Sequence, residues 1–90
     1  MVRVKFTSAL KRFFPDLEEM TASGNTLKEV FNEMEASYPR LQSYLLDEHG
    51  SLRTHVNVFI DGNVIGDRDG LSDPFSANSE IYIIQALSGG

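Results

Sequence analysis

The chemical group that distinguishes this sequence is the carboxylate of Gly90, which follows a second glycine and has no bulky side chain beside it. The tail, Leu87, Ser88, Gly89 and Gly90, comes soon after residues 81–84, an apolar run that predicts a buried strand. Such a strand holds the tail at a fixed point, and four extended residues reach roughly 13 Å. We therefore expect the tail to present its carboxylate inside another protein's active site. A frayed chain end or a cloning remnant are the alternatives that the sequence leaves open.

No second group of residues has the spacing of a catalytic or metal site. The absence of cysteine excludes a disulfide framework, an iron–sulfur cluster and a thiolate nucleophile. His49 and His55 lack the spacing of zinc ligands, and residues 67–70 lack the later bidentate glutamate of a calcium loop. The pair Glu18 and Glu19 indicates a solvated face. We expect no catalytic residue, no metal and no bound cofactor in this chain, which is then not itself an enzyme.

The composition is typical of one small globular domain. Ninety residues, of which 41% are hydrophobic and 23% charged, suffice for one core, so residues 1–90 should form a single domain with a flexible tail at 87–90. The net charge of −5 argues against nucleic acid, whose phosphates require Lys and Arg. No apolar run is long enough to span a membrane, and the first residues do not resemble a signal peptide. These features predict a cytoplasmic protein that is monomeric when free.

The elements that position the tail begin with a strand at residues 2–6, where apolar and basic residues alternate. Pro15 and Asp16 mark a turn, and residues 17–21 are the expected return arm of a hairpin.

A helix should begin at Thr26, because Thr26 and Glu29 form a capping box, and it should end at Ser37 or Tyr38, before a proline. Its expected apolar stripe is Leu27, Val30, Phe31, Met34 and Tyr38. Three leucines, Leu41, Leu45 and Leu46, predict a short second helix.

The second half of the sequence predicts three further strands. Residues 53–60 alternate clearly, and Asp61 with Gly62 is the dipeptide that a type I′ hairpin turn prefers. Residues 64–65 are the expected returning strand, followed by a polar connection at 66–78. The last strand is expected at 80–87, where the continuous apolar run favours a central, parallel position.

These elements predict an α+β fold with a mixed sheet of about five strands and one main helix on one face. The first and last strands should lie side by side and parallel at the sheet centre.

The order of the elements, with Gly89 and Gly90 leaving the last strand, resembles the ubiquitin-like β-grasp roll and, more narrowly, the MoaD/ThiS family of sulfur carriers. The specific motifs are residues 56–62, the segment from Gly70 to Pro74, and the tail. The additional residues at 45–53 make the chain more similar to the molybdopterin and cysteine-biosynthesis carriers than to the shorter thiamine carriers.

The resemblance implies chemistry at Gly90. A ubiquitin-activating-type enzyme would adenylate the Gly90 carboxylate with ATP, and sulfide or a persulfide would displace AMP to leave a thiocarboxylate. A sulfur-accepting synthase would then take the sulfur for cofactor, cysteine or other metabolite biosynthesis. Ser88 and Gly89 would thread the partner's channel, where glycine permits close approach of another backbone.

The sheet face opposite the helix is the expected docking surface for these partners. Phe59, Tyr82 and Ile84 should point away from the core, with Leu87 at the root of the tail. Burying one such side chain contributes about 1.5–3 kcal/mol.

Two alternatives use the same tail. One is a ubiquitin-like protein modifier that forms an isopeptide bond through Gly90, and the other is the small subunit of a molybdopterin synthase. A recruitment domain with an incidental tail is a third possibility.

Overall fold

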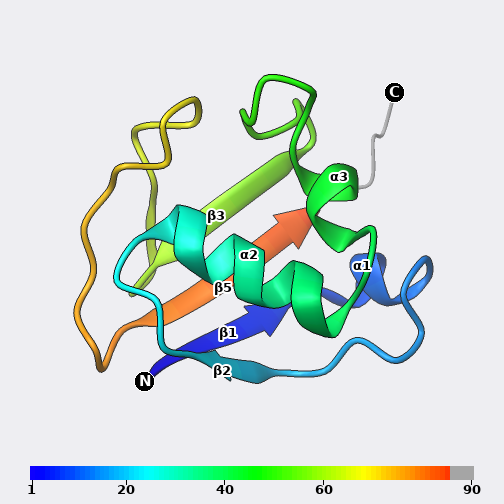
Figure 1. Cartoon of the computed structure of the whole chain (residues 1–90), viewed down its shortest axis with the longest axis horizontal. Helices are drawn as coiled ribbons and strands as arrows, with labels where there is room; N and C mark the ends of the chain where they lie inside the picture. The colour runs from blue at the N-terminus through cyan, green and yellow to red at the C-terminus, as the bar shows by residue number, and fades with distance from the viewer. Residues whose placement is uncertain (86–90) are drawn as a thin grey trace.

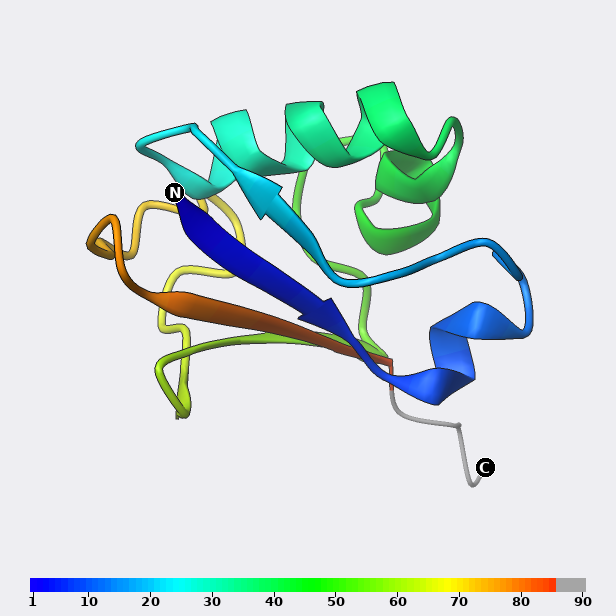
Figure 2. The same ribbon diagram turned by 90° about the horizontal axis from the view of Figure 1, so that it is seen from below.

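The computed structural model describes residues 1–85 as an α+β roll, in which a five-stranded sheet is covered on one face by the main helix (Figure 1). Turned by 90°, the structure shows α2 and α3 in one layer and the sheet in another, with α1 beyond the end of β1 (Figure 2). This confirms the predicted fold class. The elements are β1 (Val2–Phe6), α1 (Ser8–Lys11), β2 (Met20–Ala22), α2 (Leu27–Ser37), α3 (Leu41–Leu45), β3 (Val56–Ile60), β4 (Asn63–Val64) and β5 (Glu80–Gln85).

The sheet has the strand order β2-β1-β5-β3-β4 and places β5 at its centre. As predicted, β1 and β5 are parallel, with Val4 opposite Ile81. On its other side β5 pairs antiparallel with β3, where Val58 lies opposite Ile83. Ile81 and Ile83 point toward the helices and are fully buried. Tyr82 and Ile84 lie on the opposite face, which the helices do not cover, so the central position accounts for only half of the apolar run.

The β3–β4 hairpin turns at Asp61 and Gly62, which both have positive φ, 51° and 87°. This confirms the predicted two-residue turn. The carboxylate of Asp61 also accepts hydrogen bonds from the hydroxyl of Ser79, at 2.8 Å, and from the backbone N–H of Glu80, at 2.9 Å. The turn is therefore fastened to the start of β5.

Helix α2 begins as the capping pattern predicts, because Thr26 Oγ1 accepts a hydrogen bond from the Glu29 backbone N–H at 3.2 Å. The Glu29 carboxylate reaches back to the N–H of Asn25, at 2.7 Å, one residue before the position that a capping box uses. One turn later, Glu33 accepts from the N–H of Gly24 at 2.7 Å. These carboxylates satisfy backbone donors and also compensate the positive end of the helix dipole.

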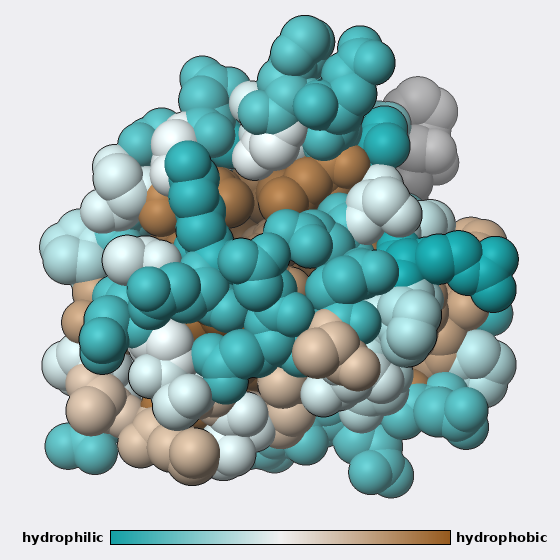
Figure 3. Space-filling model, viewed as in Figure 1, coloured by the Kyte–Doolittle hydropathy of each residue, from teal (hydrophilic) through white to brown (hydrophobic). Residues whose placement is uncertain are grey.

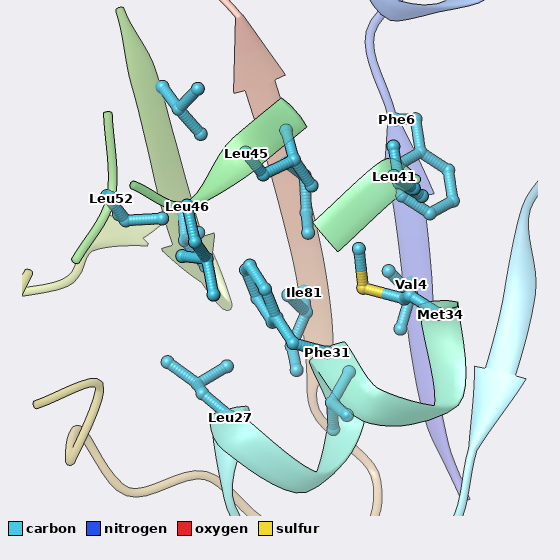
Figure 4. Close-up of a cluster of buried hydrophobic side chains, with 14 of the residues drawn as sticks. Val4, Phe6, Leu27, Phe31, Met34, Leu41, Leu45, Leu46, Leu52 and Ile81 are labelled. Atoms are coloured by element: carbon cyan, nitrogen blue, oxygen red, sulfur yellow. The ribbon is translucent and has the colours of Figure 1, made fainter. Parts of the chain in front are cut away.

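The core lies between α2, α3 and the sheet (Figure 4). The inner side of α2 is buried, whereas Tyr38 caps the helix and is only partly buried, packed against the core. On the opposite, outward side of α2, hydrophilic side chains predominate (Figure 3). The core residues that α2 and α3 contribute are Leu27, Val30, Phe31, Met34, Leu41 and Leu45.

Four details differ from the sequence prediction. Strand β4 spans Asn63–Val64 rather than residues 64–65, because Asp61 and Gly62 alone make the turn. The structure contains α1, which was not predicted because four residues without a side-chain cap give little periodic signal. The return strand begins at Met20 rather than at residue 17, because Leu17 turns into the core from a loop. Strand β3 begins at Val56 rather than at residue 53, because the preceding residues form a turn in which the Val56 N–H donates to the Arg53 carbonyl.

Candidate functional site

The predicted site has two parts, the tail and a docking surface. Gly90, Gly89, Ser88 and Leu87 lie outside the described residues, so their predicted roles stay predictions. The structure does define the point from which they extend. Gln85 is the last residue of β5, the central strand, and it pairs with Val56 of β3.

The end of β5 is fastened to the start of α1 by two hydrogen bonds. The Thr7 backbone N–H donates to the Ile83 carbonyl at 3.1 Å, and the Gln85 backbone N–H donates to Thr7 Oγ1 at 3.4 Å. Thr7 occupies the N-cap of α1, yet its side chain makes no capping hydrogen bond. Its hydroxyl therefore holds the end of the central strand instead of its own helix.

The predicted docking residues lie together on the sheet face that is turned away from α2. Phe59 and Tyr82 are register partners on β3 and β5, and Ile84 lies two residues further along the same face. Tyr82 is 38% exposed, whereas Phe59 and Ile84 are only half-buried rather than fully exposed. Val64, the β4 partner of Phe59, is 54% exposed and extends this patch, although the sequence analysis did not include it. We call these four residues the open-face patch.

Charged side chains border the open-face patch on β1. Arg3 and Lys5 both approach Glu80, at 3.4 and 3.2 Å, and Lys5 is the register partner of Tyr82. Exposed pairs of this kind contribute little to stability. Their consequence is a polar rim beside an apolar centre, the usual arrangement of a protein–protein interface.

A small hollow of about 300 Å³ lies at the end of β5, between Gln85 and the chain around Tyr44 and His55. Among the described residues, the buried side-chain oxygen of Gln85 has no hydrogen-bond partner. Arg53 also lines this hollow, while its guanidinium donates to the Ser43 carbonyl at 3.1 and 3.2 Å.

The loop that resembles part of a calcium site uses its carboxylate internally. The hydroxyl of Ser72 and then the backbone N–H of Gly70 hold the pKa of Asp67 below its ordinary value. A neighbouring carboxylate, Asp73, accepts from the backbone N–H groups of Gly66 and Asp67. Within residues 1–85 no three His, Asp or Glu side chains form a group that could hold a metal ion.

Between residues 1 and 85, no helix is both long and apolar enough to cross a membrane.

The sequence and the fold of this chain are similar to those of sulfur carrier proteins and of a small archaeal modifier protein. The sequence pattern of the ThiS family matches residues 4–90. The sulfur carrier protein CysO of Mycobacterium tuberculosis is 26% identical over 91 residues, which cover 99% of this chain and 98% of the relative.

Solved structures agree. The crystal structure of Mycobacterium tuberculosis CysO has a TM-score of 0.80 at 25% identity, covering 97% of this chain and all of the other. A chain of the Amycolatopsis orientalis BexX/CysO complex has a TM-score of 0.83 at 21% identity, with full coverage of both chains. The small archaeal modifier protein 1 from Methanosarcina acetivorans has a TM-score of 0.77 at 26% identity, covering 99% of this chain and 95% of the other.

Proposed function

This chain belongs to the ThiS family, and from that premise we propose that it is a ubiquitin-like sulfur carrier whose Gly90 carboxylate is the site of sulfur attachment. The single observation that supports this most is the match to the sulfur carrier CysO over 99% of the chain. The family pattern extends to residue 90 and so includes both terminal glycines.

The proposed reaction at Gly90 has two steps. A carboxylate oxygen first attacks the α-phosphate of ATP, so that an acyl-adenylate forms and pyrophosphate leaves. Sulfide, supplied by a partner, then attacks the acyl carbon, and the bond to AMP breaks. The product is a thiocarboxylate at Gly90, a nucleophile that a synthase can use as a sulfur source.

The partner enzymes supply the catalysis in this proposal, and the chain is their substrate. The activating enzyme binds ATP and threads Ser88 and Gly89 through a narrow channel. Ordering these tail residues costs roughly 1–2 kcal/mol each. Docking of the folded part must therefore offset several kcal/mol.

The open-face patch is the proposed docking surface for the activating enzyme. Phe59, Tyr82, Ile84 and Val64 share one sheet face, next to the strand end at Gln85. Burying one such side chain contributes about 1.5–3 kcal/mol, which matches the cost of ordering the tail. Leu87 would continue this contact at the root of the tail.

The sulfur acceptor in this proposal is an enzyme that makes cysteine or another sulfur-containing metabolite. The similarity to CysO and the additional residues at 45–53 support this assignment. The protein is proposed to act in the cytoplasm, where ATP is available to the activating enzyme.

A second function is supported by a separate observation, the 26% identity to small archaeal modifier protein 1. A modifier would pass through the same acyl-adenylate, but the ε-amine of a target lysine would attack the acyl carbon and AMP would leave. The product is then an isopeptide bond from Gly90.

One experiment separates the two functions. Protein isolated from its native host is digested and its C-terminal peptide is analysed by mass spectrometry, together with lysine-containing peptides from the same cells. Replacement of oxygen by sulfur at Gly90 supports the carrier. Gly-Gly remnants on lysines of other proteins, without sulfur at Gly90, support the modifier instead. A chain lacking Gly89 and Gly90 is the matched control and should give neither product.

A further inference from the structure

A second surface with exposed apolar residues is separate from the open-face patch and shares none of its residues. It is a groove of about 640 Å³ between the loop after α1 and the chain that joins α2 to α3. We call it the aromatic groove. Its lining includes Phe13, Phe14, Tyr38, Pro39, Arg40 and Tyr44.

Three of the aromatic rings that line the aromatic groove contact one another. Tyr44 lies between two phenylalanines, with ring centroids 5.2 Å from Phe13 and 5.5 Å from Phe14. Phe13 nevertheless remains 58% exposed. A large ring that is held in a fixed contact and still exposed to solvent is typical of a binding surface.

Hydrogen bonds hold the two sides of the groove in place. The Glu18 backbone N–H donates to the Tyr38 hydroxyl at 3.1 Å, which ties the loop after α1 to the end of α2. Within that loop the Leu17 N–H donates to the Phe14 carbonyl at 2.9 Å. The groove is therefore formed before any partner binds, which lowers the entropic cost of binding.

Basic residues occur at the aromatic groove and next to it in sequence, in a chain whose net charge is −5. Lys11 and Arg12 are exposed and directly precede Phe13, and Arg40 lines the groove. Within residues 1–85, none of these three cations is part of an ion pair. One carboxylate, Asp16, also lies in the lining.

Arg40, which lines the groove, has an unusual backbone conformation. Arg40 has a φ of 80°, a conformation that glycine adopts more easily than arginine. The Glu35 carboxylate holds it there by accepting the Arg40 backbone N–H at 2.8 Å. A strained position occupied by a long cation, at the lining of a groove, favours a binding role for its guanidinium.

The aromatic groove is continuous with the region where the tail begins. Ser43 and Tyr44 line both this groove and the small hollow that contains Gln85. Figures 1 and 2 both show α1 beside the end of β5. A partner segment in the groove would therefore lie next to the start of the tail and leave the open-face patch unoccupied.

We propose that the aromatic groove docks an acidic segment with an apolar anchor, carried by the enzyme that accepts the sulfur. This proposal rests on the proposed carrier function, since it assigns a second partner to the same tail. The apolar anchor packs on Phe13 and Tyr44, and a carboxylate of the segment pairs with Arg40. The two enzymes then recognise different surfaces, so the acceptor does not need the surface on which activation occurs.

The test starts from thiocarboxylated protein that is prepared chemically, so that acceptance is measured without activation. The acceptor enzyme's KM and kcat are measured for the wild type, Phe13→Ala and Arg40→Gly, and pyrophosphate release by the activating enzyme is measured in parallel. We expect Phe13→Ala to raise the acceptor's KM roughly tenfold or more with kcat within about twofold. Arg40→Gly should raise this KM roughly three- to tenfold, and added salt should raise the wild-type KM more than that of Arg40→Gly.

Lys28→Ala on α2 is the matched surface control and should not change either enzyme's KM. An acceptor KM that Phe13→Ala leaves at the wild-type value contradicts the groove proposal alone. If Phe13→Ala raises the KM of the activating enzyme as much as that of the acceptor, the proposal is also contradicted, because the groove would then belong to the activation surface. If the wild-type thiocarboxylate transfers no sulfur to the acceptor, the carrier function fails and the groove proposal fails with it.

Discussion

The Gln85 backbone N–H donates a hydrogen bond to Thr7 Oγ1, and this contact joins the last described residue of the central strand to the first turn after β1. The two residues lie at opposite ends of the chain, but the parallel pairing of β1 with β5 brings them together. The end of the described part of β5 is thus held on both sides, by Val56 of β3 and by Thr7 next to β1.

Replacing Thr7 by valine removes the hydroxyl and keeps the shape of the side chain. We expect Thr7→Val to lower the unfolding free energy by about 0.5–1 kcal/mol, because the Gln85 N–H loses its acceptor. Amide hydrogen exchange at Gln85 should accelerate, and this is measured by NMR. Thr7→Ser retains the hydroxyl and serves as the control, with exchange at Gln85 close to the wild-type rate. Unchanged exchange in Thr7→Val would show that the contact does not hold the strand end.

Removing the ring of Phe59 should weaken docking to the activating enzyme. Phe59 is half-buried next to Tyr82, so Phe59→Ala removes apolar area from the centre of the open-face patch. A loss of about 1.5–3 kcal/mol corresponds to a decrease of roughly ten- to a hundredfold in kcat/KM for pyrophosphate release. Phe13→Ala, an equal truncation in the aromatic groove, is the control. Wild-type kinetics for Phe59→Ala would refute the docking assignment.

Relief of the backbone strain at Arg40 should stabilise the protein. Glycine tolerates the φ of 80° that Arg40 adopts, so Arg40→Gly is expected to raise the unfolding free energy by roughly 0.5–1 kcal/mol. Arg40→Ala loses the same guanidinium but keeps the strain, and the difference between the two variants isolates the backbone contribution. The measurement is urea unfolding followed by circular dichroism. Equal stabilities of the two variants would contradict this explanation.

Acid should destabilise the fold through the carboxylates that accept backbone hydrogen bonds. The Glu80 N–H, and then the Ser79 hydroxyl, hold the pKa of Asp61 below its ordinary value of 3.8. A group whose pKa is lowered on folding contributes stability above its unfolded pKa, and this contribution is lost as the pH falls through its folded pKa. We therefore expect the unfolding free energy to decline below about pH 4.

Asp61→Asn should make that decline shallower, because the variant takes up one proton fewer on unfolding in acid. Asp69→Asn, at an exposed carboxylate in another loop, is the control and should follow the wild type. Unfolding free energies at pH 7 and at several acidic values give the two slopes. Parallel slopes for Asp61→Asn and the wild type would contradict the role of this carboxylate.

The sequence predicted the features that local chemistry determines. Asp61 and Gly62 specify their turn because both adopt positive φ, and Thr26 specifies the start of α2 through its hydrogen bond to Glu29. The apolar run of β5 predicted a central strand parallel to the first strand. The structure places β5 between β1 and β3 and parallel to β1.

What the sequence did not predict depends on contacts between distant segments. The aromatic groove forms only because the loop after α1 packs beside α3, which brings Phe13 to Tyr44. The exposure of Val64 depends on its register opposite Phe59, which a two-residue strand does not reveal. Helix α1 is too short for a periodic pattern, and its cap residue is engaged by Gln85 instead.

The most direct test of the carrier function is the mass of the C-terminal peptide after reaction. The protein is incubated with ATP, its activating enzyme and a sulfide source, and the peptide that ends at Gly90 is compared with that of a reaction without ATP. We predict ATP-dependent release of pyrophosphate and a peptide in which one oxygen of Gly90 is replaced by sulfur. An unaltered carboxylate at Gly90, in a reaction where a known substrate of the same enzyme is converted, would contradict the account.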